Sequence, residues 1–301
     1  MDFHAFKFRP KKIAPPLTHS PFARLLDELS PMLRNPAVAE IYLNARGISA
    51  ADRVGSPLPV ALNWALEDVT EFLSELAWES KTRIDPYRPF AGGVIAAMPW
   101  RWHAIISPLS PDGPLLVLRR LSFDEIGLDQ FKFENFLPHD FLNWINKGIS
   151  IIFYGATGSG KTTLLVAVLR EFFINTRLGI AEALPEIPLT SNRWFRLVEV
   201  AKDTGGRGGV DFTRVVAEMM RLSPQRLVMG ELRGEEAAML LDFASTGHGG
   251  VMTTMHAGTI DDARTRFTRL ARIPLSNLPP INGIRVWRDS AGIGHARMDQ
   301  L

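Results

Sequence analysis

A glycine-rich run of eight residues, GATGSGKT at 155–162, has the residue types needed to hold the phosphates of a nucleotide. Its glycines let the backbone fold back so that N–H groups point inward at phosphate oxygens. The positive end of a following helix would add to that field. Lys161 would bridge the β- and γ-phosphates, and the Thr162 hydroxyl would hold Mg²⁺. We therefore predict that ATP and Mg²⁺ bind through Gly155, Thr157, Gly158, Ser159, Gly160, Lys161, Thr162 and Thr163.

A second candidate is Glu231, which ends the apolar run LVMGE at 227–231. A carboxylate at the end of such a strand would lie across from the γ-phosphate, where it could orient or deprotonate the attacking water. The same glutamate could instead cap a helix that begins near Gly234. Because the chain already contains a phosphate loop, we favour the catalytic interpretation.

Glu199 and two histidines stand in comparable surroundings. Glu199 follows the run FRLV at 195–198, which places another acid at a strand end. His248 and His256 lie eight positions apart around a predicted strand, so a regular strand would direct both side chains the same way. A histidine metal pair is conceivable, although the chain has no cysteine and no matching carboxylate spacing. Histidines packed at a sheet edge are the simpler interpretation from these residues alone.

A parallel sheet would bring these residues together. From residue 149 onwards, apolar runs alternate with helical patterns, as expected for parallel strands with helices between them. The phosphate loop accordingly has the preceding strand and the following helix that its chemistry requires. The expected strands are 149–153, 195–200, 226–229 and 251–255, with a helix at 161–173 and a terminal strand pair within 281–301.

The front half predicts a smaller α+β unit. Its clearest helix covers 66–80, with the apolar side chains on one face. Strands are expected at 38–43, 103–106 and 115–118, the last two joined by a turn. We therefore expect a flexible basic leader at 1–16, an α+β domain at 17–120, a linker at 121–147 and the phosphate-loop domain at 148–301.

Composition limits the class of protein. With 46% hydrophobic and 22% charged residues, the chain is typical of a soluble globular protein. A net charge of only +2 does not by itself argue for nucleic-acid binding, so nucleic acid is not an expected partner. The absence of cysteine excludes disulfides and thiolate metal sites. The N-terminus lacks a signal peptide's apolar core, and no apolar run approaches the ~20 residues of a transmembrane segment. We expect a cytoplasmic protein whose membrane contact, if any, is peripheral.

Taken together, these motifs resemble those of the secretion ATPases of type II and type IV machines. The shared features are the phosphate loop, an "Asp box" acid at Glu199, the run GELRG at 230–234, and a "His box" from TGH at 246–248 to TTMHA at 253–257. The front half looks most like the tight-adherence pilus assembly ATPases. That likeness rests on NPAVAEIYLN at 35–44, Ile84-Asp85, Arg88-Pro89, RWHAIISPLSPDGP at 101–114 and LRR at 118–120.

The resemblance implies a homo-hexamer of two-domain subunits, with nucleotide held between a PAS-like N-terminal domain and a RecA-like ATPase domain. It further implies a motor that powers pilus assembly or a related secretion system through an inner-membrane platform protein, at the inner face of the bacterial inner membrane. By resemblance, the catalytic residues are Lys161, Glu199, Glu231, His256, Arg101 and Arg119, and His248 also contacts the nucleotide.

Two departures from the family pattern leave other functions open. The Asp box usually reads Glu-Asp, but here Val200 follows Glu199. Only 45 residues follow His256, where the relatives typically carry further helices. One alternative is therefore a weakly or non-hydrolysing subunit that binds nucleotide as a structural switch. A separate alternative follows from the resemblance, because some type IV systems serve conjugation: a DNA-transfer ATPase, which salt-sensitive stimulation of turnover by DNA would support.

Overall fold

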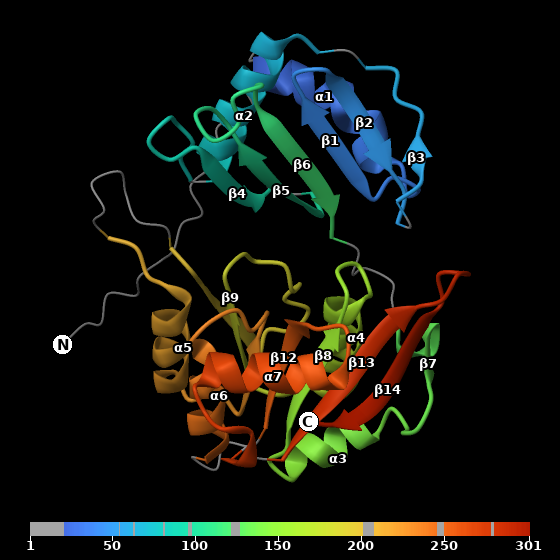
Figure 1. The fold of residues 1–301 in the computed structure, drawn as a ribbon, viewed down its shortest axis with the longest axis vertical. Coiled ribbons are helices and arrows are strands. Elements are labelled where there is room, and N and C mark those ends of the chain that lie inside the picture. Colours follow the sequence, from blue (N-terminus) through green and yellow to red (C-terminus); the bar gives the residue numbers. More distant parts are fainter. Residues whose placement is uncertain are drawn as a thin grey trace, which may run out of the picture. The chain divides into compact units, whose positions relative to one another are not determined.

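The computed structural model describes residues 21–53, 55–62, 64–80, 82–95, 98–121, 127–200, 208–245, 250–277 and 280–301. These residues divide into two compact units (Figure 1). The first contains the described residues up to 95 together with 102–119, and the second contains 98–101 together with the described residues from 120 onwards. The leader expected at 1–16 lies outside the described residues.

The first unit is a six-stranded sheet with two helices. The strand order is β3-β2-β1-β6-β5-β4, and β1 pairs antiparallel with both β2 and β6. The strands are β1 (Glu40–Asn44), β2 (Gly47–Ala51), β3 (Pro57–Leu58), β4 (Phe90–Val94), β5 (Trp100–Ile105) and β6 (Leu115–Arg120), and the helices are α1 (Pro21–Arg34) and α2 (Leu66–Glu79).

Helix α2 forms where the apolar spacing predicts it. Its buried residues Val69, Phe72, Leu73 and Leu76 follow one helical face. At its start, the Asp68 carboxylate accepts a hydrogen bond from the backbone N–H of Ala65 at 3.0 Å, which satisfies a donor that the helix itself leaves unpaired.

The second unit is built on an eight-stranded sheet in the order β10-β9-β11-β12-β8-β13-β14-β7. The six strands from β10 to β13 are mutually parallel, β14 returns antiparallel to β13, and β7 pairs parallel with β14. The strands are β7 (Phe131–Phe133), β8 (Ser150–Gly155), β9 (Leu178–Glu182), β10 (Trp194–Val198), β11 (Arg226–Met229), β12 (Val251–His256), β13 (Ile281–Arg288) and β14 (Gly294–Gln300).

Helices cover both faces of this sheet and create two apolar clusters. One cluster joins the strands to α3 (Asp140–Asn146) and α4 (Lys161–Phe172). The other joins them to α5 (Phe212–Arg221), α6 (Glu236–Ser245) and α7 (Ile260–Ala271) (Figure 1). Every residue of β8 is buried, as expected for a central strand covered on both sides. Short 3₁₀ turns lie at Leu128–Gln130 and Leu275–Asn277.

The architecture confirms the expected fold class, a RecA-like α/β domain preceded by a smaller α+β unit. Within residues 121–147, where a linker is expected, β7 and α3 belong to the second unit, and the domain boundaries themselves stay a prediction. Among the helices of the described ranges, none combines the length and apolar character that crossing a bilayer requires.

Candidate nucleotide site

The phosphate loop connects the carboxyl end of β8 to the start of α4. Gly158 and Gly160 have φ angles of +76° and +97°, in the left-handed region that glycine adopts without the steric penalty of a side chain. Gly160 occupies the N-cap position of α4. The loop therefore ends where a helix presents unpaired N–H groups, which is a site suited to an anion.

Lys161 is the buried cation of this loop. Its Nζ donates to the carbonyl oxygens of Gly155 at 3.1 Å and Ala156 at 2.8 Å. Burial lowers the pKa of Lys161 to about 8, although the negative charge of Glu231 opposes that shift. A buried ammonium at a helix N-terminus is stabilised by a bound anion, so the loop fits the phosphates of ATP.

The hydroxyl groups of the loop fit the rest of a Mg-nucleotide. Thr162 and Thr163 lie half-buried on the first turn of α4. The buried Ser159 hydroxyl has no hydrogen-bond partner within the described residues. Those residues also contain no group of three His, Asp or Glu side chains that could hold a metal ion. Mg²⁺ commonly binds through one or two protein ligands plus phosphate oxygens and water, so Thr162 is a sufficient protein ligand in this loop.

Three neighbouring parallel strands bring the other candidate groups to the loop. β12 lies between β11 and β8, and His256 at its end is in register with Gly155. Glu231 follows β11, and His256 Nε2 lies 3.5 Å from its Oε1. His256 Nδ1 lies 3.4 Å from both Lys161 Nζ and the Thr157 hydroxyl. The carboxyl edge of the sheet therefore collects Lys161, Glu231 and His256 into one cluster.

Electrostatics fix the state of this cluster. Burial, followed by the charge of Lys161, lowers the pKa of His256, so the imidazole is neutral at pH 7. One ring nitrogen can then accept from Lys161 while the other N–H faces Glu231. Arg233 Nη2 lies 2.7 Å from Glu231 Oε2, and this contact raises the pKa of Arg233. The Glu231 carboxylate is thus held between an imidazole and a guanidinium beside the phosphate loop.

The structure reveals an acid that the sequence patterns did not single out. Glu182 ends β9, the neighbour of β11, and is only 2% exposed. Its Oε1 accepts from the N–H groups of Glu186 at 3.0 Å and Ile187 at 2.8 Å. Arg196 Nε lies 2.8 Å from Oε2. Burial raises the pKa of Glu182 to about 7, against the opposing effect of Arg196. The sequence signal for Glu182 was the run LGIAE at 178–182, a short and mostly apolar segment that ends in an acid.

The remaining expected residues belong to other elements. Glu199 is exposed after the edge strand β10, and its N–H donates to the backbone oxygen of Glu182 at 3.0 Å. Arg101 lies on β5 and Arg119 on β6, and the Arg119 side chain pairs with Glu40 on β1. His248 lies outside the described residues. The catalytic roles of these residues stay predictions.

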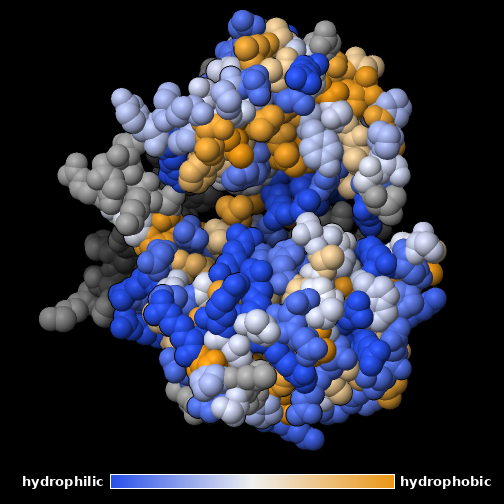
Figure 2. Space-filling view, in the orientation of Figure 1, coloured by the Kyte–Doolittle hydropathy of each residue, from blue (hydrophilic) through white to orange (hydrophobic). Residues whose placement is uncertain are grey.

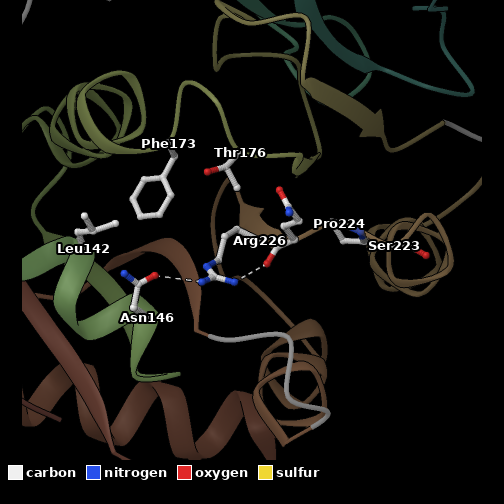
Figure 3. A pocket seen from close by; sticks show the side chains of 8 residues that line it. Leu142, Asn146, Phe173, Thr176, Ser223, Pro224 and Arg226 are labelled. Atoms are coloured by element: carbon white, nitrogen blue, oxygen red, sulfur yellow. Dashed lines mark hydrogen bonds between the residues drawn. The ribbon is translucent and has the colours of Figure 1, made fainter.

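A cavity of about 490 Å³ in the second unit is separate from this cluster (Figure 3). Its lining comes from the segments that precede β9 and β11 and from the end of α3. Inside it, Arg226 Nη2 donates to Asn146 Oδ1 at 3.1 Å. These segments lie at the amino ends of the strands, whereas the phosphate loop follows a carboxyl end, so the cavity is not part of the nucleotide site.

Comparison with known proteins identifies relatives over most of the chain. The conjugal transfer protein TrbB of Rhizobium radiobacter is 30% identical over 251 residues, which cover 81% of this chain and 75% of that protein. The type IV secretion system protein VirB11 of Brucella suis is 26% identical over 284 residues, covering 84% of this chain and 77% of that one.

Solved structures share the fold. The Legionella pneumophila ATPase DotB superposes with a TM-score of 0.59 at 19% identity, covering 95% of this chain and 82% of that one. The pilus retraction motor PilT, determined with bound ADP, gives a TM-score of 0.60 at 17% identity, covering 91% of this chain and 82% of that one. The model of the family described as "Type II/IV secretion system protein" matches residues 98–279, more than half of the chain. The protein therefore belongs to the type II/IV secretion system ATPase family.

Proposed function

We propose that this chain hydrolyses Mg-ATP as one subunit of a homo-hexameric motor in a type IV secretion machine. The carrying observation is that Lys161, Glu231 and His256 meet at the ends of adjacent strands around a phosphate loop. ATPases need a cation on the terminal phosphates and a group that orients water, and this cluster holds both residue types.

Each residue has a role that its position supports. Lys161 would leave the loop carbonyls to contact the β- and γ-phosphates. Mg²⁺, when bound beside Thr162, would neutralise charge on the phosphate oxygens. Glu231 would orient or deprotonate the attacking water. His256, which contacts both Glu231 and Lys161, would hold the Glu231 carboxylate in place. Arg101 and Arg119 are proposed to reach the phosphates, where a guanidinium can neutralise developing charge.

We also propose Glu182, in preference to Glu199, as the second acid of the site. Glu182 ends a strand adjacent to β11, and the Gly230 N–H donates to the neighbouring Ala181 oxygen at 2.8 Å. Glu199 follows the outermost strand and is exposed. A carboxylate whose pKa lies near neutrality can take up and release a proton at physiological pH, which suits an acid that acts during turnover.

The machine served is proposed from the relatives. Conjugal transfer and type IV secretion proteins are the most similar curated relatives described above, which favours a type IV secretion or conjugation-type machine. Pilus assembly, expected from the front half of the sequence, is the second candidate, and the fold match to a pilus motor accords with it. In either machine, differential affinity for ATP, ADP and the empty state would drive the motion, at a platform on the inner face of the inner membrane.

The test is steady-state ATP hydrolysis by the purified protein. We expect Glu231→Gln to lower turnover by about 10²–10⁴-fold while the protein still binds nucleotide. Glu235→Gln, an exposed neighbour paired with Arg272, is the matched control and should hydrolyse ATP normally. A wild-type protein that binds ATP but does not hydrolyse it would instead establish the nucleotide-switch alternative.

The choice between the two acids is tested by a matched pair. Glu182→Gln should reduce turnover strongly, and Glu199→Gln should leave it close to wild type. The reverse order would restore Glu199 as the second acid of the site. Stimulation of turnover by single-stranded DNA that disappears with added salt would favour the conjugation-type machine over pilus assembly.

A further inference from the structure

Strand β13 lies directly against both ends of the phosphate loop. A β-carbon built on Gly155 would overlap the backbone oxygen of Val286. A β-carbon built on Gly160 would lie 3.4 Å from Nη2 of Arg288 and 3.8 Å from its Cζ. The loop therefore rests on the backbone of β13 at its first glycine and on the Arg288 guanidinium at its last.

The side chain of Arg288 points to the same side of the sheet as α4. Side chains alternate along a strand, so Ile284, Val286 and Arg288 share one face. Ile284 and Val286 are buried in the cluster that contains the α4 residues Leu164 and Leu165. Arg288 continues this row at the carboxyl end of β13, which places its charge beside the first turn of α4.

The hairpin turn holds Arg288 in this position. Arg288 Nη1 donates to the Gly292 oxygen at 2.7 Å. The Asp289 carboxylate accepts from the N–H groups of Ala291 at 3.0 Å and Ile293 at 2.9 Å, which closes the turn. The second Asp289 oxygen lies 3.0 Å from His295 Nε2.

A stacked aromatic pair supports the same hairpin. The His295 ring stacks on Trp287, with the ring centroids 5.1 Å apart. The guanidinium is thus anchored by a closed turn.

We propose that Arg288 is a nucleotide-positioning residue: it supports the α4 end of the phosphate loop and adds a fixed positive charge to the phosphate site. This role rests on the proposed binding of nucleotide. Arg288 itself is not part of the sequence motifs from which the other site residues are predicted. Gly160 and the first turn of α4 present the N–H groups that would grip a phosphate. A cation packed on Gly160 favours an anion there, and this effect is separate from that of Lys161.

The experiment compares Arg288→Met with Arg288→Lys in the full-length protein. Methionine keeps the packing of the side-chain stem against Gly160 and removes the charge, whereas lysine keeps the charge without the planar fork. Arg297→Met is the matched control, because it removes one arginine from the opposite face of the same hairpin, where the side chain is half-exposed. Binding of a fluorescent ADP is titrated at several salt concentrations, and KM and kcat for ATP are measured separately.

We expect Arg288→Met to weaken ADP binding about tenfold and to raise KM more than it lowers kcat. Its affinity should also depend less on salt. Arg288→Lys should stay within about threefold of wild type and keep the salt dependence, since the charge remains.

Wild-type affinity in Arg288→Met, or equal losses in the methionine and lysine variants, would overturn the charge role. If Arg288→Met does not fold, Arg288→Gln, which also removes the charge, takes its place. Weaker ADP binding with a smaller salt dependence than in the wild type and in Arg297→Met supports the proposal, and wild-type affinity and salt dependence in Arg288→Gln contradict it. Absence of nucleotide binding by the wild type would refute the proposed function itself, which is a distinguishable result.

Discussion

Burial of the Lys161 side chain lowers its pKa, and this should make nucleotide binding depend on pH. Because its pKa is lowered to about 8, the amine loses its charge within a range accessible to experiment. Above that pH, the neutral amine no longer attracts phosphate oxygens. We expect nucleotide affinity to fall as the pH rises from 7 through 8, with uptake of a proton on binding.

Titration of a fluorescent ADP at pH 7, 8 and 9 measures this dependence, and calorimetry in two buffers of different ionisation enthalpy measures the proton uptake. Lys161→Arg provides the control, because arginine stays charged throughout this pH range. Any ADP binding that this variant retains should therefore not depend on pH between 7 and 9. An affinity that is independent of pH in the wild type would contradict the assignment of a lowered pKa.

The sequence predicts the individual residues of the site unevenly. Lys161, Thr162 and Glu231 stand in contiguous motifs whose chemistry is local, so their neighbourhood could be anticipated. Glu182 could not, because its closeness to β11 depends on the strand order β10-β9-β11, which no run of residues encodes. The same order explains why Glu199, which directly follows β10, lies beside the outermost strand.

The N-cap of helix α7, Thr259, lies three residues after His256 and forms a reciprocal N-terminal cap. The Thr259 hydroxyl accepts from the Asp262 N–H at 3.1 Å, and the Asp262 carboxylate accepts from the Thr259 N–H at 3.1 Å. We expect Thr259→Ala to lower the free energy of unfolding by about 1 kcal/mol. Urea denaturation measures the change, and Thr265→Ala, on the exposed side of the same helix, should be nearly neutral. Equal losses in the two variants would show that the cap is not the cause.

At the level of elements, the spacing of apolar residues and the residues that flank each run predict most strands of the second unit's sheet. The strands at 226–229 and 251–256 and the helix that starts at Lys161 are where the apolar runs predict them. β9 was not predicted, since its five residues include a glycine and lack a clear boundary. β7 and α3 were expected to be irregular, but their aromatic side chains pack together: Phe133, Phe136 and Phe141 form edge-to-face contacts.

The whole molecule consists of two units, and hydrophilic residues dominate the visible surface of the second unit, where α7 lies (Figure 2). The proposed reaction requires Arg101 and Arg119, from β5 and β6, to act on a nucleotide held by the phosphate loop. We expect Arg101→Ala and Arg119→Ala each to lower turnover on the order of a hundredfold, because a charge that stabilises the transition state is lost.

Light scattering coupled to size exclusion should show the same assembly for both variants as for the wild type, and nucleotide binding should persist. Arg46→Ala, in the turn between β1 and β2 of the same sheet, serves as the control and should hydrolyse ATP normally. Unchanged turnover in both arginine variants would remove them from the mechanism.

The parallel pairing of β7 with β14 joins residues that are more than 160 positions apart in the sequence. β7 is the first strand after the chain enters the second unit, and β14 is bonded along its length to β13, on which the phosphate loop rests. Two routes therefore join the chain ahead of β7 to Gly155 and Gly160: the covalent one through α3 and β8, and one through two ladders of backbone hydrogen bonds by way of β14 and β13. A displacement of β7 would therefore reach the phosphate loop from the β13 side as well as along the chain.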